Sequence, residues 1–165
     1  MYIKKKDSNC KITIITNGSL WKSDIWKLID EVLVSYHLGK DNIDYNKQMF
    51  PLGCTYDKVA KTIEKARQND VLLRTNTVLG TFNIESIDYI VDDLIKFKPN
   101  IVNFLPVNLF DQAEDMAQFI DYTLFRTQIK HAIDKLAIAG INDINVRYMP
   151  FCDMQGYEKH IVGTL

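Results

Sequence analysis

The stretch VLLRTNTVLGTFNIESIDYIVDDLIKFKPNIVNFLPVN, residues 71–108, holds the pattern that decides the fold. It begins with an apolar run over 71–78, continues with helical periodicity over 84–97 and ends with a second apolar run over 100–106. Two strands separated by one helix indicate a parallel pair joined by a crossover helix. Both runs also contain polar side chains, which a fully buried strand does not favour.

The rest of the chain continues this alternation. The pattern predicts further strands over 11–16, 31–37 and 143–148, and further helices over 22–29, 55–69 and 123–139. Asn83 is expected to cap the helix after the third strand, and Gly140 is expected to end the last helix. We therefore expect one α/β domain over residues 1–165, with a parallel sheet.

The polar residues lie near the ends of the strands, where parallel α/β proteins carry their chemistry. Because side chains alternate in a strand, Ser35 and His37 share one side, as do Arg74 and Asn76. Polar pairs of this kind favour a barrel, or part of one, over a doubly wound sheet. A doubly wound nucleotide-binding domain remains an alternative, although no G-x-G-x-x-G or G-x-x-x-x-G-K-[ST] follows any strand.

Composition and charge narrow the function classes. The 165 residues carry 20 basic and 21 acidic side chains, a net charge of -1, which gives no argument for nucleic acid as a partner. No apolar stretch approaches the roughly 18 residues of a membrane helix, and no secretory signal follows the first lysines. The three cysteines are far apart in sequence, so we expect no disulfide framework and a cytoplasmic location.

Five segments, in order along the chain, carry a resemblance to a known family. They are TNGSLW (16–21), SYHLGKD (35–41), LLRTNTVLGTFN (72–83), VNFLPVN (102–108) and VRYMPFCDMQGYEKH (146–160). Each falls at one of the expected strands or at a strand end. Together they resemble radical S-adenosylmethionine (SAM) proteins over nearly the whole chain.

The resemblance implies a partial TIM-like barrel, part of a (βα)6 barrel. In that family a reduced 4Fe-4S cluster cleaves SAM to a 5′-deoxyadenosyl radical that abstracts hydrogen from the substrate. The chain departs from the family in lacking the C-x3-C-x2-C cluster motif and the GGE-type segment. It therefore looks like barrel strands three to six with part of a C-terminal extension, and the cluster is available only if a missing N-terminal part is supplied.

The resemblance also assigns residues near the first two strands. It places Thr16 and Asn17 near the SAM methionine or the substrate, although Asn-Gly is also ordinary turn chemistry. It makes Ser35 a contact to the SAM ribose or carboxylate. His37 is a candidate for substrate contact or proton transfer, and its alternative is a neutral, hydrogen-bonded histidine.

Arg74 and Asn76 are the corresponding residues of the third strand. A charge between apolar neighbours is costly unless it is paired, so Arg74 is expected either to bind the SAM carboxylate or to form a structural ion pair. Asn76 resembles the family's polar contact to the ribose.

The fourth strand supplies the last assignments. Asn103 is expected to face the interior of the barrel, and Leu105 to Val107 resembles the segment that holds adenine, with plain core packing as the alternative. Cys152, Asp153 and His160 match no compact metal motif, so no metal site is predicted.

These assignments predict a portion of a radical SAM enzyme that binds SAM and an unknown substrate, and that is inactive alone. The alternative is a cluster-free remnant that binds SAM, a nucleoside or a protein. A barrel without its first strands has an open edge, so we also expect self-association or a complementing polypeptide.

Overall fold

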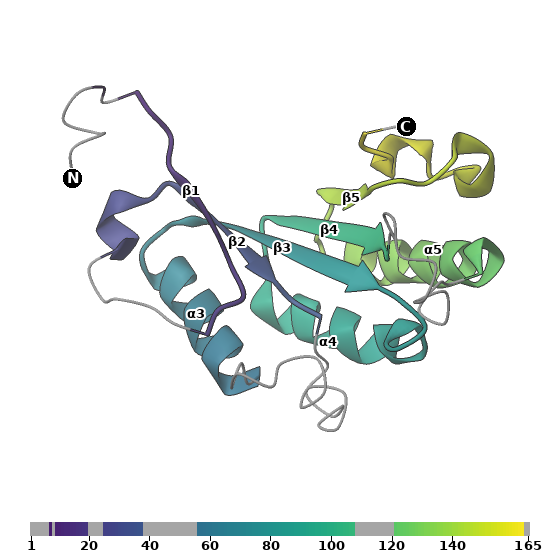
Figure 1. The fold of residues 1–165 in the computed structure, drawn as a ribbon, viewed down its shortest axis with the longest axis horizontal. Helices are drawn as coiled ribbons and strands as arrows, with labels where there is room; N and C mark the ends of the chain where they lie inside the picture. Colours follow the sequence, from purple (N-terminus) through teal and green to yellow (C-terminus); the bar gives the residue numbers. More distant parts are fainter. Residues whose placement is uncertain (1–6, 8, 20–24, 38–55, 108–120, 164–165) are drawn as a thin grey trace, which may run out of the picture.

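The computed structural model describes residues 7, 9–19, 25–37, 56–107 and 121–163. Within these residues, five strands form one parallel sheet in chain order, with β1 and β5 at its outer edges (Figure 1). The strands are β1 (Thr13–Thr16), β2 (Glu31–Ser35), β3 (Leu72–Leu79), β4 (Ile101–Pro106) and β5 (Ile144–Val146). The expected α/β class with a parallel sheet is confirmed.

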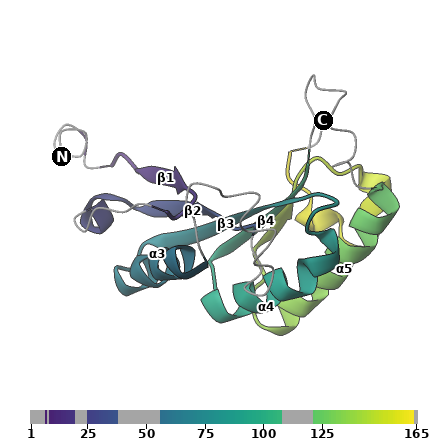
Figure 2. The ribbon, with the colours of Figure 1, turned by 60° about the horizontal axis from the view of Figure 1, so that its bottom comes forward.

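Three α-helices lie together on one face of this sheet (Figure 2). They are α3 (Tyr56–Gln68), α4 (Ile87–Phe97) and α5 (Tyr122–Ile138), which follow β2, β3 and β4 in the chain. Short 3-10 helices complete the described elements: η1 (Ile25–Leu28), η2 (Ile84–Ser86), η4 (Phe151–Met154) and η5 (Glu158–His160). None of the helices in the described part is long and apolar enough to cross a membrane.

Local sequence explains where two of these helices begin and end. The Asp121 carboxylate accepts hydrogen bonds from the backbone N–H groups of Thr123 (2.6 Å) and Leu124 (3.4 Å), which caps the first turn of α5. Helix α4 ends where Lys98 takes a left-handed conformation (φ 49°) ahead of Pro99. Gly140, at φ 85°, follows α5 as expected.

Asn83 takes the N-cap position of η2, ahead of α4, but does not cap it with its side chain. Its side chain makes no cap hydrogen bond, because its Oδ1 accepts from Gly80 N (2.9 Å) and its Nδ2 donates to Val78 O (2.9 Å). Asn83 therefore closes the loop after β3. The expected helix over 22–29 is seen only as η1, and residues 22–24 lie outside the described residues.

The core lies between the sheet and its helices. Every second strand residue points into it, including Val34 of β2, Leu73 of β3 and Phe104 of β4, each at most 1% exposed. Burying a side chain of the size of Phe104 contributes about 1.5–3 kcal/mol. The intervening residues lie on the other face of the sheet, which carries none of the three α-helices and is named the open face.

Candidate functional site

A row of polar side chains crosses four strands on the open face. The strand register places Ser35 beside Asn76, Asn76 beside Asn103, and Asn103 beside Asn145. Paired residues of parallel strands point to the same face, so these four residues, named the polar row, form one line. The sequence predicted the first three of them. Asn145 was missed, and its only signal is its place between two apolar residues of β5.

The members of the polar row differ in how much hydrogen-bonding capacity they retain. Asn103 is 1% exposed, donates to Thr75 O (3.0 Å) and accepts from Asn145 Nδ2 (3.2 Å). The Asn103 amide therefore already donates and accepts hydrogen bonds within the sheet. The Ser35 hydroxyl and the Asn76 amide are partly exposed and have no hydrogen-bond partner in the described part of the chain. These two groups are available to a ligand.

An apolar ledge lies next to the polar row, toward the carboxyl ends of the strands. It consists of Val78 and Leu105, which are in register, and Val107, whose N–H donates to Leu79 O (2.8 Å). The three side chains are partly exposed. A polar row beside an apolar ledge can hold a ligand with a hydroxyl-rich part and a flat apolar part.

His37 lies just beyond the end of β2 and is bound to β3. Its Nδ1 accepts a hydrogen bond from Val78 N (3.0 Å), and burial lowers its pKa from 6.5 to about 4. The imidazole is therefore neutral near pH 7, which is the hydrogen-bonded alternative considered for it. A group with this pKa is a weak base, so the arrangement does not favour proton transfer. Contact with a substrate stays a prediction.

Arg74 forms the ion pair that the sequence left as one of two alternatives. Its Nε lies 2.9 Å from Glu31 Oε1, and Glu31 Oε2 accepts a hydrogen bond from Thr13 Oγ1 (2.9 Å). The Nε and Oε1 atoms are not aligned as a hydrogen bond. The pair lies on the amino-terminal side of the polar row, because Arg74 precedes Asn76 on β3. A ligand carboxylate at Arg74 stays a prediction.

Thr16 and Asn17 form a turn after β1. Thr16 is in register with Val34, so its side chain lies on the helix-covered face, away from the polar row. Its Oγ1 accepts from Gly18 N (3.0 Å), and Asn17 Oδ1 accepts from Ser19 N (3.1 Å) and Ser19 Oγ (2.7 Å). These bonds are the turn chemistry of the Asn-Gly pair.

A buried polar contact beneath the open face fixes the end of β2. Tyr36 is fully buried, and its hydroxyl donates to Asp93 Oδ2 (2.7 Å) on α4. Burial first, and the bond to Asp93 second, raise the pKa of Tyr36. Thr77 Oγ1 also donates to Tyr36 O (2.7 Å). Side chains therefore hold β2 against β3 and α4 at the point where the strand ladder stops.

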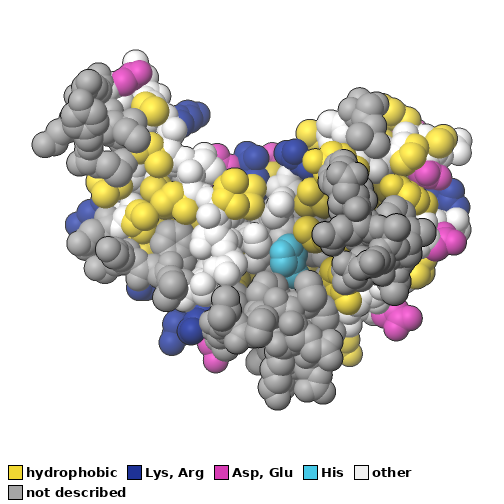
Figure 3. All heavy atoms as spheres, in the orientation of Figure 1, with side chains coloured by type: hydrophobic (Ala, Val, Ile, Leu, Met, Phe, Trp, Pro, Cys, Tyr) yellow, Lys and Arg dark blue, Asp and Glu magenta, His cyan; other side chains and the backbone are white. Residues whose placement is uncertain are grey.

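The space-filling view shows the molecule hollowed over the strands, between its two ends (Figure 3). Uncharged polar and backbone atoms cover much of the middle of this view, beside a hydrophobic patch and a histidine, and charged side chains lie at the upper rim. Apart from Arg74, Glu31 and Arg147, which also lie over the sheet, this surface is mostly neutral. It suits hydrogen bonding to neutral groups more than binding of a polyanion.

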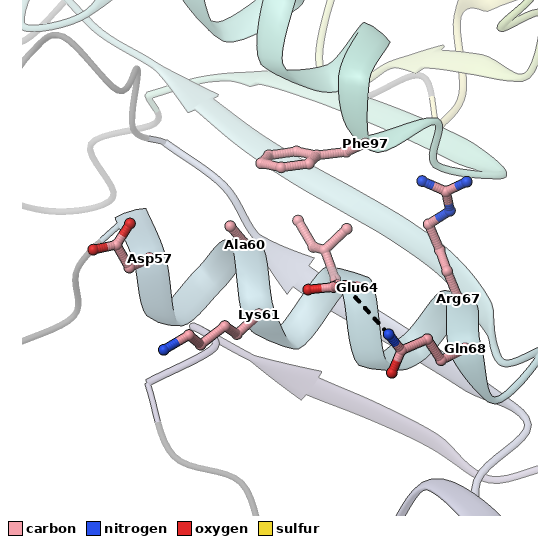
Figure 4. A pocket seen from close by; sticks show the side chains of 8 residues that line it. Asp57, Ala60, Lys61, Glu64, Arg67, Gln68 and Phe97 are labelled. Atoms are coloured by element: carbon pink, nitrogen blue, oxygen red, sulfur yellow. Dashed lines mark hydrogen bonds between the residues drawn. The ribbon is translucent and has the colours of Figure 1, made fainter.

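A separate groove of about 650 Å³ lies on the helix side, between α3 and Phe97 at the end of α4 (Figure 4). Its charged lining alternates in sign along α3, from Asp57 and Lys61 to Glu64 and Arg67. Glu64 is also bonded to Gln68 of the same helix (3.2 Å). Nothing in the structure shows what would cover this groove, and it lies on the opposite side of the sheet from the polar row.

The described residues contain no group of three or more His, Cys, Asp and Glu that could hold a metal ion. Asp153 is paired with Arg126 (3.2 Å), His160 Nδ1 donates to Ile144 O (2.8 Å), and Cys152 is exposed. The described part of the chain therefore does not fit an iron–sulfur cluster. Cys54 lies outside the described residues.

No protein-family model matches the chain, and no curated protein sequence matches it. Solved structures do match. SuiB from Streptococcus suis bound to S-adenosylmethionine is similar with a TM-score of 0.68 and 19% identity, over 95% of this chain and 37% of that one. SuiB bound to the precursor peptide SuiA has a TM-score of 0.65 and 18% identity, over 99% of this chain and 34% of that one.

The enzyme anSMEcpe with bound AdoMet (S-adenosylmethionine) is similar with a TM-score of 0.62 and 18% identity, over 88% of this chain and 42% of that one. SuiB and anSMEcpe are radical SAM enzymes. The expected α/β fold, a parallel sheet with helices that matches part of the barrels of these structures, is therefore confirmed. The chain spans about two fifths or less of the length of these structures. At this identity, the likeness establishes the fold alone.

Proposed function

We propose that this chain is a SAM-binding portion of a radical SAM enzyme whose cluster ligands lie outside it. The observation that carries the proposal is the pair of available groups on neighbouring strands, the Ser35 hydroxyl and the Asn76 amide. They lie beside an apolar ledge, on a chain whose fold matches SuiB bound to S-adenosylmethionine. Hydroxyl and amide groups suit the ribose, and the ledge suits the adenine ring.

In this proposal the chain binds and orients the cofactor. Ser35 and Asn76 exchange hydrogen bonds with the ribose hydroxyls, while Leu105 and Val107 shield the adenine from water. If another part of the complete enzyme held a cluster, that group would supply the electron that cleaves SAM, while this chain would supply position and water exclusion. The substrate is a second small molecule or a peptide, since SuiB was also solved with a precursor peptide.

Isothermal titration calorimetry of the whole chain with SAM tests the proposal. The variants Ser35→Ala and Asn76→Ala are expected to weaken binding up to about tenfold each, because each loses one hydrogen bond to the ribose. Asn142→Ala is the matched control, since Asn142 is an exposed residue ahead of β5 that lies outside the polar row. Failure of SAM to bind the unmodified chain at millimolar concentration, or unchanged affinity in both variants, would refute the proposal.

We further propose that the outer edge of β1 pairs with another polypeptide or with a second copy of the chain. Among the described strands, β1 pairs only with β2, so half of its backbone groups face outward. Ile15 of β1 is 72% exposed. Apolar side chains beside an unpaired strand edge promote association.

Light scattering during size-exclusion chromatography tests this association. Ile15→Lys is expected to shift the chain toward the monomer, because a charge beside the edge opposes strand pairing. Ile138→Lys is the control, since Ile138 is 89% exposed at the end of α5. A monomer at every concentration would count against the open edge.

The described cysteines, Cys10 and Cys152, are free thiols, which fits the proposed cytoplasmic location.

A further inference from the structure

Arg147 lies on the open face, at the carboxyl end of β5. Its N–H donates to Phe104 O (3.0 Å), which continues the ladder between β4 and β5 by one residue. Alternation along the strand then places Arg147 on the same side as Asn145, beside the apolar Leu105. Sequence reasoning did not select it, although it lies within the strand expected over 143–148.

In the part of the chain that the structure describes, the Arg147 side chain is a partly buried cation with no anion beside it. Its guanidinium makes no hydrogen bond or ion pair within the described ranges. Two other arginines of similar exposure are paired, Arg74 with Glu31 (2.9 Å) and Arg126 with Asp153 (3.2 Å). A partly desolvated charge is costly unless a counter-charge compensates it, and Arg147 has none among these residues.

Two neighbouring features point to a ligand at this position. Asn145 donates to Asn103 Oδ1 (3.2 Å), which holds its side chain on the open face and leaves its Oδ1 without a partner in the described part. Tyr148 has a φ of 59°, a left-handed conformation that costs about 1–3 kcal/mol in a residue other than glycine. Strain of this kind is typical of binding sites, and here it ends β5 directly after Arg147.

We propose that Arg147, oriented beside Asn145, is a carboxylate-binding residue of the open face. The inference rests on the proposed function, because it adds a charged subsite to the same ligand surface. A guanidinium binds a carboxylate through two parallel hydrogen bonds, which fixes the orientation of the ligand as well as adding affinity. The carboxylate belongs either to the aminoacyl group of SAM or to an acidic side chain of the substrate.

Modification of the whole chain with phenylglyoxal, followed by peptide mass spectrometry, tests the state of each arginine. Arg147 is expected to react several-fold faster than the ion-paired Arg74. The reaction is repeated with SAM and with 5′-methylthioadenosine, which lacks the carboxylate. It is also repeated with N-acetyl-Ala-Glu-Ala-amide and with the matching peptide that has Gln in place of Glu.

Protection of Arg147 by SAM but not by methylthioadenosine assigns the carboxylate to SAM. Protection by the Glu peptide and not by the Gln peptide assigns it to the substrate. In either case Arg147→Gln is expected to weaken binding of the protecting ligand about tenfold or more, and Arg147→Lys less, while affinity for the uncharged analogue is unchanged.

Three results overturn the inference: Arg147 as unreactive as Arg74, no protection by any carboxylate ligand, or unchanged affinity in Arg147→Gln. Failure of the proposed function is a separate outcome. There, neither SAM nor methylthioadenosine binds the unmodified chain, while the Glu peptide still reports on the subsite at Arg147.

Discussion

Low pH should lower the free energy of unfolding of this protein through one contact, the hydrogen bond from Val78 N to His37 Nδ1 (3.0 Å). Only the neutral imidazole can accept this bond, and burial lowers the pKa of His37 from 6.5 to about 4. Between these two values the unfolded chain takes up a proton that the folded chain does not. The stability that the neutral His37 contributes is therefore fully present above pH 6.5 and is lost as the pH falls toward 4.

The size of the effect depends on the two pKa values. Between about pH 7 and about pH 5, the proton uptake of the unfolded chain lowers the free energy of unfolding by about 2 kcal/mol. The variant His37→Asn isolates this contribution, because an amide oxygen can take the place of Nδ1 and does not titrate. The stability difference between the native chain and this variant should therefore fall by about 2 kcal/mol over that range.

Urea unfolding, followed by circular dichroism at several pH values, measures this difference. The control is His131→Asn, since the His131 side chain is 57% exposed beside Asp88. This variant should still lose stability as the pH falls, because His37 is unchanged. Parallel pH profiles of the native chain and His37→Asn, within about 0.5 kcal/mol, would show that His37 is not the titrating group.

The remaining predictions concern the support of the site, and each is measured by the free energy of unfolding in urea. Tyr36→Phe should cost about 1–3 kcal/mol, because it removes the hydroxyl that donates to the buried Asp93 (2.7 Å); a cost below about 0.5 kcal/mol would contradict the role given to this bond. Phe104→Ala should cost about 3–5 kcal/mol, because the side chain is fully buried in the core. Gly140→Ala (φ 85°, no atom within 4 Å of a new Cβ) should cost about 1 kcal/mol through strain alone. Gly18→Ala should cost more, because its Cβ would also lie 3.2 Å from Val59 Cα; equal costs would mean that the close approach is relieved.

Much of the fold could be predicted from the sequence, because periodicity reports burial directly. The predicted strands over 71–78 and 100–106 correspond to β3 and β4 with shifts of one residue at their ends. The predicted helix over 55–69 corresponds to α3, where Val59, Ile63 and Ala66 repeat at helical spacing on the buried side. Asn83 misled the sequence reasoning, since its cap preference was overridden by two hydrogen bonds to the preceding loop.

The candidate site was predictable only in part. Alternation along single strands placed Ser35 with His37 and Arg74 with Asn76, and the strand register puts Ser35, Arg74 and Asn76 on the open face. Whether each polar group is available to a ligand depends on partners distant in sequence. Glu31 pairs with Arg74 from another strand, and Val78 binds His37 across 41 residues.

The sequence by itself determined the elements, the parallel sheet and the face of each strand that carries polar groups, because these depend on local periodicity. Only the tertiary structure decided the register, and register alone brings Asn145 of β5 next to Asn103 of β4. Only the tertiary structure also shows that Arg74 is ion-paired with Glu31, while the charge of Arg147 has no partner in the described part of the chain. The physical reason is that a side chain's hydrogen bonds and ion pairs are made mostly across strands, between residues that no sequence spacing connects.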